Sequence, residues 1–153
     1  MSFTIAVRLH RYDSDPTTDQ ATTFIPLPVA GLAYSWRKQF KLNFLTTPVG
    51  TISNLRLYSD GVSWGTGVTV YVAVSPTYFL ASPFDAINQI DGAVVLTTKT
   101  VLSPLVVNAG VVLSNPAVGY GIQSYVMIQV SVDHTALEGI PTPRALTYVW
   151  DET

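Results

Sequence analysis

An alternation of apolar and polar residues between Trp36 and Val74 constrains the fold of this chain more than any other sequence feature. In the segment 36–44, phenylalanine and leucine share one side while glutamine, lysine and asparagine share the other. The segments 51–58 and 68–74 are also strand-like, and the latter carries four valines on one face. Successive side chains of a strand point to opposite sides of a sheet, so a period of two is typical of half-buried strands. Because only short turns join these segments, we expect the three strands to form a central meander.

Further strand-like segments occur along the rest of the chain. A short helix is predicted at 82–89, where Ser82 can cap the first turn and Pro83 suits the first helical position. About eight strands separated by turn residues indicate an all-β protein, an antiparallel β-sandwich, and a jelly roll is one arrangement that this number of strands allows. With no second patterned region, we predict one domain over 1–153. The additional predicted strands are 3–10, 93–101, 105–113, 122–132 and 146–150.

Residues 12–34 lose the strand pattern and form a long irregular segment. Pro26 and Pro28 bias it toward extended structure and prevent regular ladder pairing along its whole length. Long segments of this kind are often binding loops or partner-contacting arms. Two interpretations stay open: an arm that packs across a partner protein, and a long surface loop with a short edge strand near 32–34. The arm interpretation assigns partner binding to the apolar side chains of Phe24, Ile25, Leu27, Val29 and Leu32.

The chain is poor in charge for a protein of its size. Charged residues make up 12% of it, against about 25% in ordinary soluble domains, and its mean hydropathy is +0.32. No apolar run approaches the roughly 18–20 residues that a membrane-spanning helix needs, so we expect no membrane partner. We interpret the charge deficit as surface that meets other protein, in a homo-oligomer or a larger particle. An unusually apolar monomer is the alternative.

Two classes of partner and site are disfavoured by composition. The formal net charge is −2 and no cluster of Lys or Arg occurs, which argues against nucleic acid as the main partner. The chain contains no cysteine, so disulfide bonds and thiolate metal sites are excluded.

Candidate catalytic and metal-binding groups are scattered. His134 lies near Asp133 and Glu138, but no catalytic or metal-binding motif surrounds them. Three aspartates within 13–19 have the spacing of a calcium loop, yet the glycine and the closing glutamate of that motif are missing. The glycines of 61–67 precede a predicted strand, so no helix dipole would face a phosphate there. We therefore predict a protein that is not an enzyme and that has no metal site and no cofactor.

Aromatic residues suggest two kinds of binding surface. Trp64 is expected in a loop between two strands, where a core residue is unusual, so it is predicted to contact either a ligand or a protein partner. Carboxylates and amides that would orient sugar hydroxyls do not accompany it, and we favour the protein interface. Other aromatic residues that could complete a sugar-stacking platform are Trp36, Trp150, Tyr71, Tyr78, Tyr120 and Tyr125.

The segments 52–61 (Ile-Ser-Asn-Leu-Arg-Leu-Tyr-Ser-Asp-Gly) and 65–71 (Gly-Thr-Gly-Val-Thr-Val-Tyr), with the strand 36–44 and the end 146–152, resemble small virion structural proteins of tailed bacteriophages. Within that group the chain is most similar to β-sandwich proteins that decorate or cement the capsid, or that sit at the neck or tail. The resemblance implies a non-enzymatic protein located in the virion. It also implies a homotrimer at capsid threefold positions that contacts the major capsid protein.

The predicted function is therefore to decorate or cement a phage capsid by bridging major capsid protein subunits. Such bridging adds contact area that resists pressure from the packaged genome. The segment 12–34 would be one contact and the loop 59–67 the second. The alternative is a carbohydrate- or receptor-binding β-sandwich module of a phage tail or neck, which would use Trp64 and nearby tyrosines.

Overall fold

Nine strands and one short 3-10 helix are the regular elements in the part of the chain that the computed structural model describes. The description covers residues 2–7, 32–35, 37–42, 50–78, 90–113, 124–136 and 144–153. The elements are β1 (Ser2–Val7), β2 (Leu32–Tyr34), β3 (Lys38–Phe40), β4 (Ile52–Ser59), β5 (Val68–Ser75), β6 (Val94–Val95), η3 (Leu96–Thr98), β7 (Leu105–Leu113), β8 (Tyr125–Asp133) and β9 (Arg144–Glu152).

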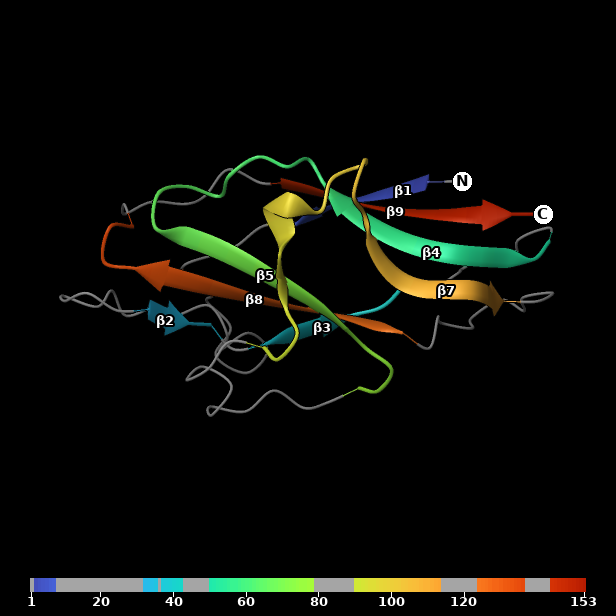
Figure 1. The fold of residues 1–153 in the computed structure, drawn as a ribbon, viewed down its shortest axis with the longest axis horizontal. Helices are drawn as coiled ribbons and strands as arrows, with labels where there is room; N and C mark the ends of the chain where they lie inside the picture. Colours follow the sequence, from blue (N-terminus) through green and yellow to red (C-terminus); the bar gives the residue numbers. More distant parts are fainter. Residues whose placement is uncertain are drawn as a thin grey trace.

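The strands form two antiparallel sheets stacked in two layers (Figure 1). One sheet has the order β1-β9-β4-β7 and the other has the order β2-β8-β5-β6. β3 pairs with β8 on the same side as β2, because β5 occupies the other side of β8 along nearly its whole length. The two short strands are thus two parts of one interrupted edge. The predicted antiparallel all-β sandwich is confirmed.

The strand pairs are nested from the ends of the described chain inward. β1 pairs with β9, β2 and β3 pair with β8, β4 pairs with β7, and β5 pairs with β6. Successive pairs alternate between the two sheets, and the pairings of β4 with β9 and of β5 with β8 join them within each sheet. The described strands thus form one nested set of antiparallel pairs, and these pairs are divided between the two layers.

The predicted central meander is wrong. β3 and β5 lie in one sheet on opposite sides of β8, and β4 lies in the other sheet. Alternation determines which face of a strand is buried, but it does not determine which strand lies beside it. The chain changes sheet between β3 and β4 and again between β4 and β5, so apolar faces from all three strands meet one core.

The strand predicted at 93–101 is much shorter than expected. Only Val94–Val95 pair with β5, and η3 then turns the chain. Leu96 is fully buried, and the hydroxyl of Ser59 lies 3.0 Å from the Leu96 carbonyl oxygen and 3.1 Å from that of Lys99. These contacts satisfy carbonyl groups that a strand would direct at a neighbouring strand, which favours the turn.

Helical structure is scarce in the described residues. The helix predicted at 82–89 lies outside them, and η3 spans three residues. Within the described part of the chain, no helix is long and apolar enough to cross a membrane.

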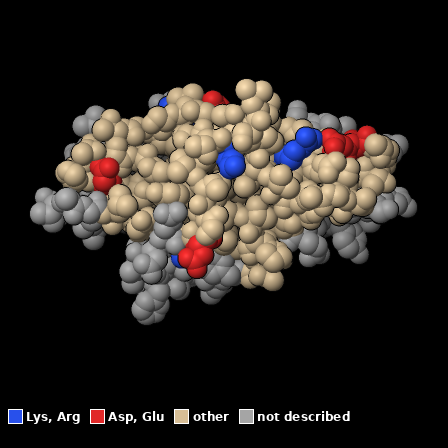
Figure 2. All heavy atoms as spheres, viewed as in Figure 1, with Lys and Arg blue, Asp and Glu red and all other residues tan. Residues whose placement is uncertain are grey.

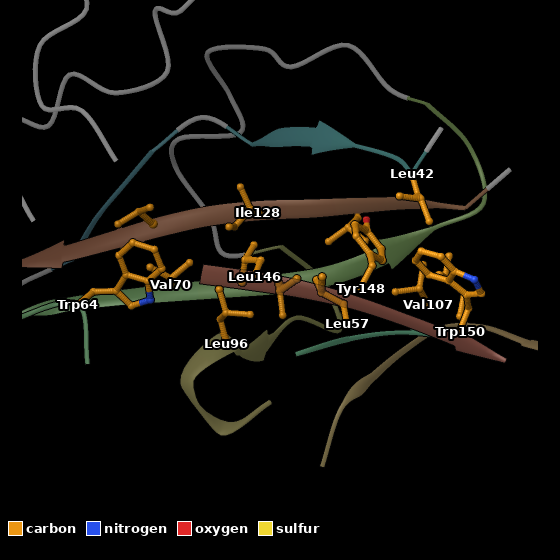
Figure 3. Close-up of a cluster of buried hydrophobic side chains, with 14 of the residues drawn as sticks. Leu42, Leu57, Trp64, Val70, Leu96, Val107, Ile128, Leu146, Tyr148 and Trp150 are labelled. Carbon is orange, nitrogen blue, oxygen red and sulfur yellow. The ribbon is translucent and has the colours of Figure 1, made fainter. Parts of the chain in front are cut away.

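The core lies between the two sheets and has a tryptophan at each end (Figure 3). Trp64 lies beside Val70 at one end, and Trp150 lies beside Val107 at the other. Leucines from β4, η3 and β9 occupy the space between them. Both layers therefore contribute to one continuous apolar cluster, which is the main stabilising feature of a sandwich.

Tyr148 connects the two sheets through its ring. The ring of Phe40, from the opposite sheet, meets it edge-to-face with 6.3 Å between centroids and an interplanar angle of 80°. Tyr148 is 1% exposed, and burial raises the pKa of its hydroxyl. That hydroxyl has no hydrogen-bond partner in the described part of the chain. Its burial therefore costs free energy that no bond from the described residues offsets.

Replacing Tyr148 with phenylalanine should raise the free energy of unfolding by about 1 kcal/mol, because the ring stays and the unpaired hydroxyl is removed. Thermal melting should then shift upward by roughly 2–4 °C for a domain of this size. The half-buried Tyr58 gives a matched control, since Tyr58→Phe should leave the melting temperature nearly unchanged. A lower melting temperature for Tyr148→Phe would mean that the hydroxyl has a stabilising partner.

Candidate functional site

The structure describes one of the five apolar residues assigned to the arm. Phe24, Ile25, Leu27 and Val29 lie outside the described residues. Leu32 begins β2, and its side chain is about half exposed. β2 pairs with β8, so the short edge strand predicted near 32–34 is confirmed. Whether the preceding segment crosses a partner stays a prediction.

Trp64 is the other predicted partner-binding residue, and the structure places it in the core instead. Its side chain is 5% exposed, although both neighbouring residues are exposed. It lies beside Val70 at one end of the sandwich (Figure 3). The expectation of a surface aromatic is wrong because the loop folds its indole inward and uses it to close the end of the core.

The loop between β4 and β5 is held to neighbouring segments by hydrogen bonds. At its start, the backbone N–H of Ser59 donates to the Lys99 carbonyl oxygen at 2.7 Å. In its middle, Nη2 of Arg144 donates to the carbonyl oxygen of Ser63 at 2.8 Å. Gly61 adopts a φ of +74°, and a Cβ there would press on the turn that follows η3. The loop thus packs directly against that turn.

Exposed apolar side chains gather on that turn and on the strand after it. Leu102 is 93% exposed, and Val101, Val106 and Val111 are each more than half exposed. We call these four residues the β7 strip. β7 is the last described strand of its sheet, so its outer edge has no strand partner within the described residues. Apolar side chains on a sheet edge favour contact with another chain.

Charges that usually protect a sheet edge are missing from the β7 strip. No Asp, Glu, Lys or Arg occurs between residues 100 and 132. Figure 2 shows a face on which charged residues form a few separate groups in a mostly uncharged surface. The strand predicted at 105–113 was not singled out as a contact surface. The long uncharged run was the signal that could have located it.

The two faces of β7 differ, and the register with β4 identifies them. Val106 lies opposite Arg56 and Val111 lies opposite Ser53, on the face that points away from the core. Leu105 and Val112 pack against the core instead. Register shifts between the two strands introduce extra residues into β7. The strand is therefore bulged between its two outward valines.

A polar cluster borders the β7 strip on the same sheet. Arg56 Nη2 lies 2.7 Å from Asp151 Oδ1, and Asn54 Nδ2 donates to Asp151 Oδ2 at 2.8 Å. Asn54 has a φ of +52°, and its Oδ1 accepts the backbone N–H of Gly110 at 3.2 Å. Exposed ion pairs contribute little free energy, so this cluster mainly fixes the local geometry of the bulge.

The acidic residue and histidine at the end of β8 form a turn. Asp133 Oδ1 accepts hydrogen bonds from the side chain and the backbone N–H of Thr135, and these bonds lower the pKa of the Asp133 carboxyl. His134 is exposed, and Glu138 lies outside the described residues. No group of three His, Cys, Asp or Glu that could hold a metal occurs among the described residues. These contacts favour the interpretation of Asp133 as a residue that stabilises a turn.

An aromatic pair with one well-exposed and one half-buried ring lies at the ends of β5 and β8. The rings of Tyr78 and Tyr125 lie 5.7 Å apart, and Nζ of Lys41 lies 5.5 Å from the Tyr125 centroid. Tyr78 is well exposed. Both tyrosines belong to the aromatic residues that could complete a sugar-stacking platform, and the structure brings these two together.

No protein-family model matches the chain, and the searches of curated proteins and of solved structures gave no match either. Function is therefore inferred from the fold, the surface and the sequence resemblance.

Proposed function

We propose that this chain is a virion structural protein that decorates or cements a phage capsid by bridging major capsid protein subunits. The observation that carries the proposal is the β7 strip, an exposed and uncharged apolar surface on a sheet edge. Exposed apolar side chains on an uncharged sheet edge favour contact with another chain. The role is mechanical, and it requires no reaction centre.

We also infer that the sandwich is a jelly roll. Its support is the nested pairing, in which the outermost strands pair with each other and successive pairs alternate between two sheets. Counting β2 and β3 as one interrupted strand gives eight strands, the number of a jelly roll. Viral capsid and lectin domains both use this architecture, so the fold agrees with the proposal without deciding it.

The proposed contact follows from the chemistry of the β7 strip. Leu102 projects from the turn that follows η3, and its side chain is almost fully exposed and accessible to a partner. The bonded loop beside it adds the exposed Val62. An apolar surface on neighbouring capsid subunits would cover these side chains and release water. The protein would then join the subunits that it contacts.

Replacing Leu102 with aspartate should reduce binding to capsids at least tenfold, because a charge would be buried without a partner. The assay is co-sedimentation with empty capsids made from the major capsid protein encoded in the same genome. Leu102 is 93% exposed, so the variant should keep its circular dichroism and melting temperature. Thr77→Asp, at an exposed bend outside the β7 strip, is the matched control and should bind normally. Failure of the unmodified protein to bind capsids would overturn the proposal.

The Tyr78 and Tyr125 pair favours a second candidate, a carbohydrate- or receptor-binding module of a phage tail or neck. Exposed tyrosine rings can stack on the apolar faces of sugars, and Lys41 could donate to a hydroxyl. Its support is weaker than that of the first proposal, because the buried Trp64 is not available to extend the platform. Glycan-array binding that disappears in Tyr78→Ala would favour this candidate.

A further inference from the structure

We propose that Asp91 is a site of slow covalent self-modification, at which its peptide bond to Gly92 rearranges into an isoaspartyl bond. The chain contains two Asp-Gly pairs, at 60–61 and 91–92, and no Asn-Gly pair. A glycine after aspartate makes this rearrangement easiest, because no side chain hinders the attacking backbone nitrogen. The two pairs have different surroundings in the structure, and these surroundings favour reaction at the second pair. The inference is independent of the proposed function.

The rearrangement requires water and no other reactant. The backbone nitrogen of Gly92 attacks Cγ of the protonated Asp91 carboxyl, so an N–C bond forms, the nitrogen loses its proton, and one carboxyl oxygen leaves as water. The product is a five-membered succinimide ring. Water then opens the ring at one of its two carbonyl carbons and gives either aspartate or isoaspartate. In isoaspartate the main chain runs through Cβ and Cγ, which adds one CH2 group to the backbone.

The pair at 91–92 lies at the exposed tip of a tight turn. The N–H of Ala93 donates to the Ile90 carbonyl oxygen at 3.1 Å, and Gly92 has a φ of +68°, as in a type II turn. A Cβ on Gly92 would meet no described atom within 4 Å beyond the adjacent residues. The Asp91 carboxylate and the Gly92 N–H have no hydrogen-bond partner among the described residues. Both reacting groups are therefore available to each other when the turn rearranges.

The pair at 60–61 contains the same two residues, but neighbouring groups hold them. The backbone nitrogen of Gly61, which would be the attacking group, donates to Ser59 Oγ at 3.2 Å. Oδ1 of Asp60 accepts the backbone N–H of Val62 at 3.0 Å, which fixes the carboxyl. A Cβ on Gly61 would lie 3.0 Å from Cγ2 of Thr100, so a neighbouring segment also restricts the turn. Reaction at this pair requires these hydrogen bonds to break first.

Isoaspartate at 91 would disturb the segment that leads into β6. Ile90 is 3% exposed, and its N–H donates to Oε1 of Gln129 at 2.9 Å. On the other side of the turn, β6 is held by its pairing with β5. An added CH2 group lengthens the connection between these two attachments, so one of them must shift. We expect the Ile90 amide to be released, because one side chain holds it whereas strand pairing holds β6.

Peptide mapping of the full chain after prolonged incubation at mildly acidic pH tests the site. Chymotrypsin cleaves after aromatic residues and separates the two Asp-Gly pairs, and fragmentation mass spectrometry then measures isoaspartate in each. In the folded protein, conversion at Asp91 should be about tenfold faster than at Asp60, or more, because each hydrogen bond that must break lowers the reactive population. In urea the two rates should become similar, since the surroundings that distinguish the pairs are lost.

The rates in folded and denatured protein decide the inference. Equal conversion of the two pairs in the folded protein, or faster conversion at Asp60, would overturn it. Conversion at Asp91 that is slowed by folding as strongly as conversion at Asp60 would also overturn it, because the turn at 91–92 would then be protected.

Asp91→Glu is the matched control, because glutamate keeps the charge but would have to form a less favourable six-membered ring. This variant should show almost no rearrangement at position 91 after the same incubation. Hydrogen exchange measures the effect on the fold: the Ile90 amide should exchange faster in the isoaspartate-containing protein than in fresh protein, and incubated Asp91→Glu should match fresh protein. Unchanged exchange at Ile90 in the modified protein would contradict the proposed release of that amide. Circular dichroism shows whether each sample is folded.

Discussion

Replacing Trp64 with alanine is expected to lower the free energy of unfolding by about 3–5 kcal/mol, the range for deleting a large aromatic side chain from a core. The indole is 5% exposed and closes one end of the sandwich (Figure 3). Its removal would leave a cavity beside Val70 and would open that end of the core to water. Urea denaturation monitored by circular dichroism measures the loss. A domain of ordinary stability, about 5–15 kcal/mol, would lose a large fraction of it.

The neighbouring Val62 provides the control for this variant. It belongs to the same loop but is exposed, so Val62→Ala should change the free energy of unfolding by about 0.5 kcal/mol or less. If Trp64→Ala kept the stability of the unmodified protein and lost only partner binding, Trp64 would be an interface anchor after all, and its placement in the core would be wrong.

Replacing Gln129 with leucine should lower the free energy of unfolding by about 2–5 kcal/mol, since two buried backbone groups would each lose a partner. Gln129 lies in β8 and is 0% exposed. Its Oε1 accepts the backbone N–H of Ile90 at 2.9 Å, and its Nε2 donates to the carbonyl oxygen of Ser35 at 3.0 Å. Leucine keeps a similar volume, so the expected loss comes from hydrogen bonding and not from a cavity.

Hydrogen exchange gives this second variant a specific signature. The Ile90 amide should exchange faster in Gln129→Leu, while amides in the distant β4–β9 ladder should change only with global stability. Gln39→Leu is the matched substitution at a less buried amide side chain, and it should cost less than about 1 kcal/mol. Unchanged exchange at Ile90 together with unchanged stability would mean that Gln129 does not hold the two segments.

The strands were the most predictable part of the fold. The predicted strands 51–58, 68–74 and 105–113 agree closely with β4, β5 and β7, because each buries one face and exposes the other. Which strands become neighbours was not predictable from alternation, since the period of two is the same for every pairing. The shortening of 93–101 to β6 depends on a distant partner, the buried hydroxyl of Ser59.

The sequence could predict that the protein has an apolar contact surface, but it could not predict where that surface lies. The low charge content indicated contact with other protein, and the β7 strip is an exposed surface with the expected character. Its location depends on which strand ends the sheet, a property of the topology. The prediction that Trp64 contacts a partner at the surface is wrong for a related reason. A loop position suggests exposure, but the sandwich has open ends that loop side chains can fill.

The nested pairing of strands has a consequence for synthesis of the protein on the ribosome. β1 leaves the ribosome first, yet its partner β9 is made more than a hundred residues later. At roughly 5–20 residues per second, that delay is on the order of ten seconds, during which β1 lacks β9, its partner among the described strands. The pair of β5 and β6 is complete much earlier, and each outer pair closes after the one inside it. Until β8 and β9 are made, the two sheets are incomplete and the apolar faces that they will bury stay open to neighbouring chains. This order of pairing makes the nascent chain most exposed to aggregation just before β8 and β9 emerge.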